Sequence, residues 1–341
     1  MYNKKIMENA HLDEWGNELP IQTENIAFKS DEMVGCAKCE RANPPNRSNC
    51  IYCGAELEIL EVQSRRPKPN LRKLEFWEKG FNLIFTPNSQ ISSAEKRAEI
   101  AKLLKMEREV LDKIIETGKT LPLARAESEK EAENARNWLL ELGVETRILS
   151  DEILAIEKPT KRLRGIEFFD DKLILIFFNQ DEIVEISNED LVLTVTGAIM
   201  ERKITATEKY NKKSENKILD ATETASDDAL IDIYDRRDSL GYRILAKGFD
   251  FSCLEAEKGI LAKDNIRKLA GKLREVAPNA EFVDDYLQNR ELLATVWEVE
   301  QKSDSQGLKR EGFGKFSLGN ITTVNNLSQF TKYSRLHWHL L

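Results

Sequence analysis

The sequence predicts a multidomain α+β protein that contains a cysteine-rich metal-binding segment, a small module of alternating strands and helices, and an antiparallel β-rich domain closed by C-terminal helices. Three observations lead to this prediction. First, paired cysteines occur in one short stretch. Second, segments with a strand-like or helix-like spacing of apolar residues alternate over residues 76–152. Third, apolar residues recur mostly at every second position in residues 160–300, as in strands. The 341 residues are enough for two or three domains of about 150 residues each.

The composition is that of a folded protein with a well-solvated surface. Charged residues make up 32% of the chain, above the usual value of about 25%, and the net charge is −8. This negative charge argues against a broad nucleic-acid-binding face. The longest apolar run, Leu173 to Phe178, is far shorter than the roughly 20 residues of a membrane span, and the first residues lack the apolar core of a signal peptide. We therefore expect a cytoplasmic protein without a membrane span.

The clearest chemistry lies in residues 31–60, which follow a polar arm at residues 1–30. The spacing CxxC-x10-CxxC is formed by Cys36, Cys39, Cys50 and Cys53. Each CxxC can fold as a tight turn whose two thiolates converge on a metal, and two such turns supply the tetrahedral sulfur ligands that zinc prefers. Without a signal peptide, disulfides are the poorer explanation, and an iron centre or a redox dithiol are the alternatives to zinc.

This cysteine pattern resembles a zinc ribbon. The resemblance implies a structural Zn²⁺, since thiolates fill all four positions and leave no place for a catalytic water. Gly54, directly after Cys53, is expected to take the positive φ that closes the second turn. Zinc ribbons often recognise nucleic acid or protein, and a purely structural clip is the alternative.

A basic, proline-containing linker is expected at residues 61–75. Arg65, Arg66 and Lys68 are candidate phosphate contacts within it. A solvated, extended spacer is the favoured reading of the same residues.

Residues 76–152 predict the order β-α-α-β-α-β. The expected strands are residues 81–85, 122–126 and 146–149. The expected helices start at Ser92 or Ser93, before Val110, and at Ser128, and they end at Lys105, Gly118 and Gly143.

The amino-acid sequence of residues 103–118 and 121–148 resembles the C-terminal domain of the bacterial ribosomal stalk protein, and the resemblance covers about 70 residues. That domain and the similarly folded adaptor of the Clp protease bind other proteins through exposed helix or loop surfaces. Lys105-Met106-Glu107-Arg108 stands where the stalk family has a glycine- and lysine-rich loop for translation factors, so factor binding is not carried over. A purely structural module is the alternative.

Residues 160–300 predict a meander of antiparallel strands, interrupted by a polar break from Lys209 to Asp228. Helices are expected at residues 265–276 and 282–297. Strands closed by helix loosely resemble a pleckstrin-homology-like barrel, in element order only. The isolated Cys253 is expected to be a buried core thiol, with a nucleophile as the alternative.

Residues 301–341 show little periodicity, and we expect an irregular tail containing aromatic residues. This tail either packs around the folded domains or binds a partner, and the candidate partner-binding residues are Phe330, Tyr333 and Trp338. His337 and His339 would share one face if this segment were a strand, but no third metal ligand is near in sequence.

The function favoured by these features is a non-catalytic zinc-binding adaptor or scaffold with a protein partner. A nucleic-acid- or ribosome-associated protein is the alternative, supported by the basic segments at 64–73 and 202–217 and opposed by the overall acidity. An enzyme with a site between the β-rich domain and the tail is the third hypothesis, and it is disfavoured because histidine occurs only at His11, His337 and His339. The oligomeric state is left open.

Overall fold

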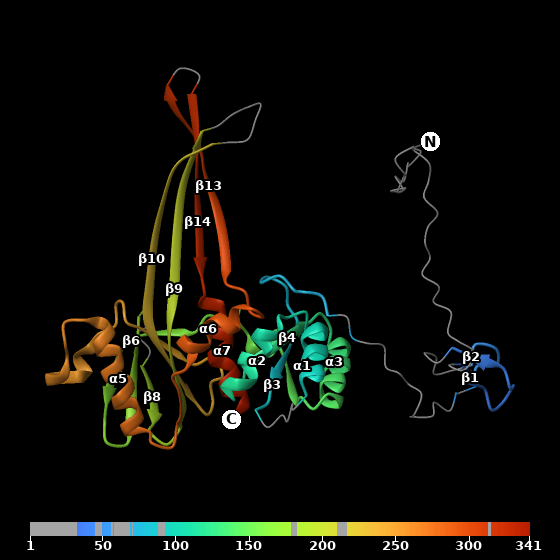
Figure 1. Cartoon of the computed structure of the whole chain (residues 1–341). Helices are drawn as coiled ribbons and strands as arrows, with labels where there is room; N and C mark the ends of the chain where they lie inside the picture. Colours follow the sequence, from blue (N-terminus) through green and yellow to red (C-terminus); the bar gives the residue numbers. More distant parts are fainter. Residues whose placement is uncertain are drawn as a thin grey trace, which may run out of the picture. The chain divides into compact units, whose positions relative to one another are not determined.

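The structure is a computed structural model that describes residues 33–44, 50–55, 57, 69, 71–87, 93–178, 183–209, 217–312 and 315–341. The chain divides into unit 1, Met1–Pro67, and unit 2, Lys68–Leu341 (Figure 1). Helices and strands occur together throughout unit 2, in agreement with the predicted α+β class. None of the helices in the described ranges is long and apolar enough to cross a membrane.

Unit 1 is a small two-stranded element around the cysteines. Strand β1 (Val34–Gly35) pairs antiparallel with β2 (Ala42–Asn43). Its buried cluster consists of Cys36, Cys50 and Leu57. So small an apolar core cannot stabilise a fold by itself, which makes a bound metal the expected source of folding energy. The predicted arm at residues 1–30 lies outside the described residues.

The first part of unit 2 has the element order that the sequence predicts. The elements are β3 (Phe81–Phe85), α1 (Ala94–Leu104), α2 (Arg108–Thr117), β4 (Pro122–Ala126), α3 (Glu129–Glu141) and β5 (Thr146–Ser150). Strand β3 lies in the middle and pairs antiparallel with both neighbours. Most predicted boundary residues are the observed ones, since Ser93 precedes α1, Gly118 ends α2 with a φ of 59°, and the Ser128 hydroxyl accepts the Glu131 N–H. The third helix, α3, ends at Glu141 with Leu142 as its C-cap, just before the predicted Gly143. A short helix α4 (Asp151–Leu154) follows.

The rest of unit 2 is built on a nine-stranded sheet in the order β13-β14-β9-β10-β11-β6-β7-β8, with β12 beside β9. Its strands are β6 (Lys161–Phe168), β7 (Lys172–Phe177), β8 (Ile183–Ser187), β9 (Leu191–Lys209), β10 (Lys217–Asp235), β11 (Tyr242–Leu245), β12 (Glu281–Val283), β13 (Glu300–Gly312) and β14 (Lys315–Asn325). The sheet is antiparallel as predicted, apart from the parallel pairs β11–β6 and β12–β9. A 3₁₀ segment (Phe251–Glu257), α5 (Ala262–Val276) and α6 (Tyr286–Ala294) complete the fold.

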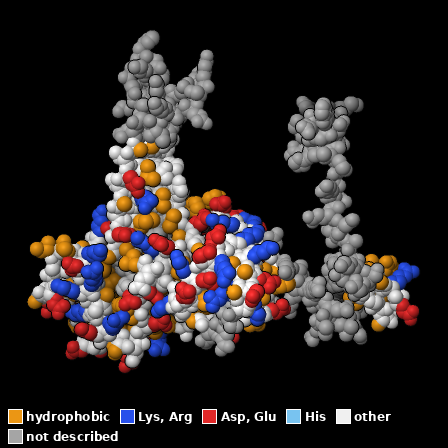
Figure 2. Space-filling model, viewed as in Figure 1, with side chains coloured by type: hydrophobic (Ala, Val, Ile, Leu, Met, Phe, Trp, Pro, Cys, Tyr) orange, Lys and Arg blue, Asp and Glu red, His pale blue; other side chains and the backbone are white. Residues whose placement is uncertain are grey.

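Four of these strands, β13, β14, β9 and β10, continue beyond the body as a single-layer arm (Figure 1). The predicted polar break from Lys209 to Asp228 is corrected here, because β9 runs to Lys209 and β10 starts at Lys217. Alternating threonine, alanine and charged residues are compatible with a strand that has water on both faces, since the backbone ladder supplies the hydrogen bonds. Figure 2 shows hydrophobic and charged side chains together on the visible face of the arm.

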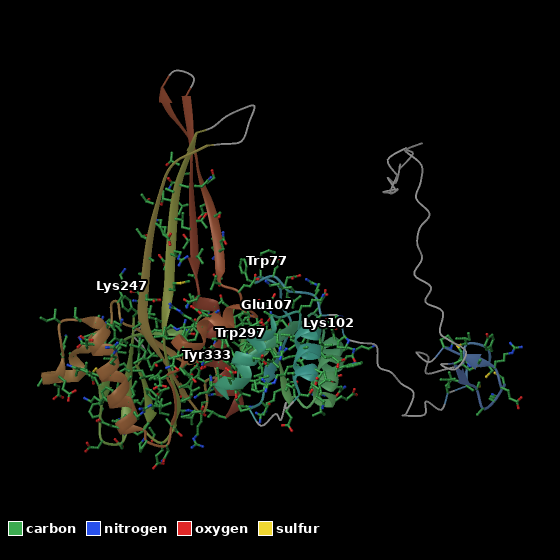
Figure 3. The ribbon with its side chains drawn as sticks, viewed as in Figure 1. Trp77, Lys102, Glu107, Lys247, Trp297 and Tyr333 are labelled. Atoms are coloured by element: carbon green, nitrogen blue, oxygen red, sulfur yellow. The ribbon has the colours of Figure 1, made fainter. Side chains whose placement is uncertain are left out.

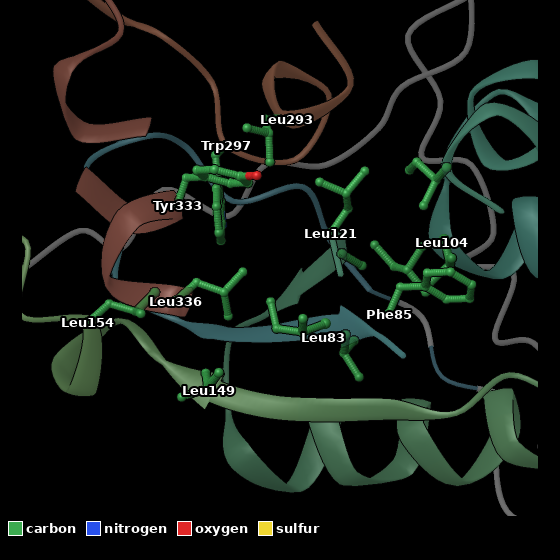
Figure 4. Packing of buried hydrophobic residues seen from close by; sticks show 14 of the residues in the cluster. Leu83, Phe85, Leu104, Leu121, Leu149, Leu154, Leu293, Trp297, Tyr333 and Leu336 are labelled. Carbon is green, nitrogen blue, oxygen red and sulfur yellow. The ribbon is translucent and has the colours of Figure 1, made fainter. Parts of the chain in front are cut away.

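The prediction of an irregular tail at residues 301–341 is wrong. These residues form β13, β14 and the helix α7 (Leu327–Leu340). Phe330, Tyr333 and Leu336 are fully buried, and Figure 4 shows Tyr333 and Leu336 among core residues from β3, β5 and α6. Gly197 of β9 has no room for a Cβ because the Phe330 ring lies directly against it. The segment is therefore part of the core rather than an attachment to it.

Polar side chains of α7 are buried as well, and this explains the missing helical period. Gln329, Lys332 and Arg335 are each at most 4% exposed. The guanidinium of Arg335 donates to the carbonyl oxygens of Leu154, Ala155 and Lys158, so it closes the C-terminal end of α4. A helix surrounded by protein on all sides has no polar face to mark its period.

One hydrophobic cluster runs from Leu71 to Leu336 and joins the segments that the sequence suggested as separate domains, 76–152 and 160–300. A second cluster lies between the sheet and α5, and Cys253 packs against it. Burial raises the pKa of the Cys253 thiol, as expected for a core cysteine and not for an activated nucleophile.

Candidate metal centre

The four paired cysteines of unit 1 converge on one point. Their Sγ atoms all lie within 4.8 Å of one another, with Cys36 and Cys53 3.6 Å apart and Cys39 and Cys50 3.5 Å apart. A tetrahedral zinc with Zn–S bonds of about 2.3 Å requires sulfur atoms about 3.8 Å apart. The distances are close to this value and far longer than a disulfide bond of about 2.05 Å. The arrangement is that of four free thiols around a metal-sized space.

Both CxxC turns use the same backbone hydrogen bonds. The amides of Cys36 and Cys50 donate to the carbonyl oxygens of Arg41 and Ala55, at 3.0 and 2.7 Å. The amides of Glu40 and Gly54 donate to the carbonyls of Cys36 and Cys50, at 2.8 and 2.9 Å. The two turns are thus structurally equivalent, and each presents its thiols from the same local geometry.

The residue after each second cysteine has a left-handed backbone. Gly54 has a φ of 70°, which confirms the expectation from the sequence. Glu40 occupies the equivalent place in the first turn with a φ of 60°, a conformation that a residue with a Cβ adopts at a cost. Glu40 was not expected from the sequence, although its position four residues after Cys36 matches that of Gly54 after Cys50.

The Asn43 side chain links the two turns through hydrogen bonds. Its side chain is fully buried, its Nδ2 donates to the Arg41 carbonyl at 2.8 Å, and its Oδ1 accepts the Ile51 N–H at 2.9 Å. One amide side chain therefore bridges the end of the first turn and the start of the second. Nothing in the cysteine spacing singles out Asn43 for this role.

Backbone amides around the cluster favour thiolates. Burial raises the pKa of the Cys50 thiol, but N–H groups of Tyr52 and Cys53 and the neighbouring thiols lower it to about 6. N–H groups of Cys39 and Lys38 lower the pKa of Cys36. The Arg41 amide lowers the pKa of Cys39, yet burial and the neighbouring thiols outweigh it and raise the value to about 12. Four sulfurs this close ionise together only with a cation between them.

The donor set fits a structural zinc. It contains sulfur alone, its N–H donors hold the ligands in place, and all four tetrahedral positions belong to the protein. Within the described ranges, these cysteines are the only group of three or more His, Cys, Asp or Glu residues placed to hold a metal. An iron centre would use the same four-sulfur set.

The remaining predicted site residues lie elsewhere. Arg65, Arg66 and Lys68 are outside the described residues. Phe330 and Tyr333 are buried in the core of unit 2, where they are inaccessible to a partner. Trp338 is half-buried, and its Nε1 donates to the Asp235 carbonyl at 3.2 Å.

His337 and His339 lie on a helix, so they do not share the strand face considered from the sequence. His337 Nδ1 lies 3.8 Å from a carboxylate oxygen of Glu281, and His339 Nε2 lies 3.2 Å from the Ile153 carbonyl oxygen. Residues two apart point to different sides of a helix, which separates the two imidazoles.

Comparisons with known proteins give no family for this chain. No protein-family model, curated protein or solved structure matches it. The resemblances to a zinc ribbon and to the ribosomal stalk domain stay predictions from the sequence. Function is therefore inferred from the geometry of the site.

Proposed function

We propose that this protein is a zinc-binding, non-catalytic adaptor whose unit 1 is a zinc ribbon. The observation that carries the proposal is the convergence of Cys36, Cys39, Cys50 and Cys53 within 4.8 Å, with the same backbone geometry in both turns. Because four thiolates complete the coordination of zinc, the metal holds unit 1 together and has no open position for a substrate.

Surface features support an interaction role. On unit 1, Ile51 and Tyr52 are more than half exposed, on the turn that the metal would fix. Arg41 lies over the Tyr52 ring at 4.8 Å, which gives this surface an aromatic and a cationic group together. Exposed aromatic and arginine side chains are typical anchors of protein interfaces.

Buried charges in unit 2 support packing rather than catalysis. Asp232 forms a two-point ion pair with Arg243, with both contacts at 2.7 Å, and Asp151 is paired with Arg125 and Lys332. Charged groups that satisfy one another in the interior stabilise a fold and leave little capacity for proton transfer to a substrate.

Metal analysis of three proteins tests the zinc proposal. The wild type is expected to hold one zinc per chain, Cys50→Ser to lose it, and Cys253→Ser to keep it, because Cys253 packs in unit 2. Unit 2 of the Cys50→Ser variant is expected to melt unchanged. Iron in place of zinc, or full zinc retention in Cys50→Ser, contradicts the assignment.

A nucleic-acid-associated role is the second candidate, favoured by the basic residues Arg65, Arg66 and Lys68. If these contact phosphate, each contributes about −0.9 to the slope of log affinity against log salt on duplex DNA. Changing all three to glutamine is then expected to flatten the slope by roughly two to three units. Binding too weak to measure at low salt removes this candidate and leaves the protein partner.

A further inference from the structure

Unit 2 contains a groove of about 490 Å³ that combines an apolar lining with basic residues. It lies between residues 71–74, the turn from α1 to α2, strand β4 and the end of α6. Leu74, Met106 and Val110 contribute apolar surface, Arg72, Lys73 and Lys105 contribute positive charge, and Glu107 adds one carboxylate. We refer to these seven residues and their neighbours as the basic-rimmed groove. Its size is in the range of pockets that hold small ligands or a few peptide residues.

The charges of the groove are not all balanced from within the protein. Arg72 pairs with Glu78 at 2.8 Å and Glu127 at 2.9 Å, and Lys73 pairs with Glu298. Lys105 is exposed and has no ion pair with any residue that the structure describes. It is held at a fixed place because it ends α1 with a φ of 54° and its backbone N–H donates to the Lys102 carbonyl. A ligand carboxylate would find an available cation here.

A buried hydrogen-bond donor also lines the groove. The Arg125 side chain is 4% exposed, and its two terminal nitrogens donate to the Glu75 and Glu78 carbonyls and to Asp151. Its Nε has no hydrogen-bond partner within the described part of the chain. The Nε is itself covered by protein atoms, so a ligand in the groove does not reach it, and Arg125 contributes to the groove only as part of its wall.

An exposed tryptophan stands beside the groove in sequence. Trp77 follows Leu74 in the segment that forms one wall, and its side chain is 66% exposed although it packs edge-on against Phe76 at 4.8 Å (Figure 3). Tryptophan is strongly enriched among the residues that dominate binding energy at interfaces. Trp77 does not itself line the groove, but it places an exposed aromatic side chain in the segment next to the wall residue Leu74.

We propose that the basic-rimmed groove binds an acidic, hydrophobic peptide segment of a partner protein. Apolar side chains of the segment enter between Leu74, Met106 and Val110, and its carboxylate faces Lys105, which has no ion pair among the described residues. Trp77 lies in the segment that adjoins the groove and contacts the peptide from there. The proposal deepens the adaptor function by naming the chemistry of the partner, and it is independent of the metal. A small organic acid of similar chemistry is an alternative occupant that the experiment separates.

The test is a selection of random twelve-residue peptides displayed on phage against the full-length chain. The selected peptides are expected to contain aspartate or glutamate beside leucine, phenylalanine or tryptophan. Synthetic versions are then titrated by fluorescence anisotropy against Lys105→Glu, Trp77→Ala and the control Lys102→Glu, an exposed lysine of α1 that does not line the groove. Thermal melts of each variant show that it is folded.

Lys105→Glu and Trp77→Ala are each expected to weaken binding about tenfold or more, and Lys102→Glu to leave it nearly unchanged. Higher salt is expected to weaken the wild-type complex, since its charges are near the surface. Selection of neutral or basic peptides, no selection at all, or equal binding by Lys105→Glu and Lys102→Glu overturns the proposal. If small carboxylates do not displace the bound peptide, a peptide ligand is supported. If they displace the peptide completely, the proposal is overturned. Peptide binding that persists in Cys50→Ser shows that the groove acts independently of the zinc site. The groove proposal and the zinc proposal can therefore fail separately.

Discussion

Lys332 of α7 lies 2.9 Å from an oxygen of Asp151, and both side chains are buried. The same carboxylate accepts from Arg125 at 2.6 Å, from the Gly80 amide at 2.9 Å and from Asn82 at 3.0 Å. Burial alone would raise the pKa of Asp151, but Lys332 and Arg125 outweigh it and hold the pKa below its usual range. An ion pair thus joins α7 to the first residue of α4, which lies far earlier in the sequence.

Lys332→Met is expected to lower the free energy of unfolding by about 3 kcal/mol at pH 7, because Asp151 loses a buried partner. A carboxyl with a depressed folded-state pKa stabilises the fold above its unfolded-state value and loses this contribution as the pH falls through the folded-state pKa. The substitution raises the folded-state pKa, so acid unfolding should begin at higher pH. Urea melts at pH 7 and pH 4 measure both effects. Lys263→Met, at an exposed lysine, is the control, and identical melts of the two variants would contradict the role of the pair.

Glu40→Gly is expected to stabilise the metal-bound form of unit 1 by about 1 kcal/mol, because glycine adopts the left-handed backbone without strain. The matching change Gly54→Ala should act in the opposite direction. Competition with a zinc chelator measures both, and about a fivefold change in affinity corresponds to this energy. If both substitutions shift zinc affinity the same way, the two turns are not equivalent.

Asn43→Ala is expected to weaken zinc binding about tenfold, because the Ile51 amide loses its acceptor inside the protein. Asn279→Ala, an exposed asparagine of unit 2, provides the matched control in the same chelator competition. Unchanged zinc affinity in Asn43→Ala would mean that the metal alone fixes the two turns.

Phe330→Ala is expected to destabilise unit 2 by about 3–5 kcal/mol, because it leaves a cavity against Gly197 and Tyr286. Trp338→Ala should cost less, since Trp338 is only half-buried. Removing residues 327–341 should unfold unit 2 and leave zinc bound to unit 1. Calorimetry of the three variants tests this, and unchanged melting would return Phe330 and Trp338 to a partner-binding role.

The elements of residues 76–152 could be predicted because their signals are local. Ser93, Gly118 and Ser128 mark helix ends within a few residues of the bonds that they make, and short, mostly apolar runs such as Phe81–Phe85, which Thr86 and Pro87 close, mark the strands. In the same way, the spacing of the cysteines was enough to predict their convergence. Gly54 could be recognised because glycine itself signals a positive φ.

The features that could not be predicted depend on contacts between residues far apart in the sequence. Lys332 and Arg335 look like surface residues until Asp151 and the carbonyls at the end of α4 are placed beside them. Glu40 has no side-chain feature that signals its backbone, and Asn43 acts through an amide on the far side of the spacer. A pattern based on hydrophobic period cannot register a polar residue whose partner is elsewhere in the fold.

The position of α7 has a consequence for how the chain is made. During synthesis, the β-α-α-β-α-β segment and most of the large sheet leave the ribosome before α7 does, yet their shared core contains Phe330, Tyr333 and Leu336. Until α7 emerges, that apolar surface has no cover, and partly folded chains with such surface are prone to aggregate. Unit 1 needs only its own cysteines and a metal, so it can fold while the ribosome is still translating unit 2. The nascent chain would therefore carry a folded cysteine site before unit 2 is complete, and would be most dependent on chaperones just before α7 appears.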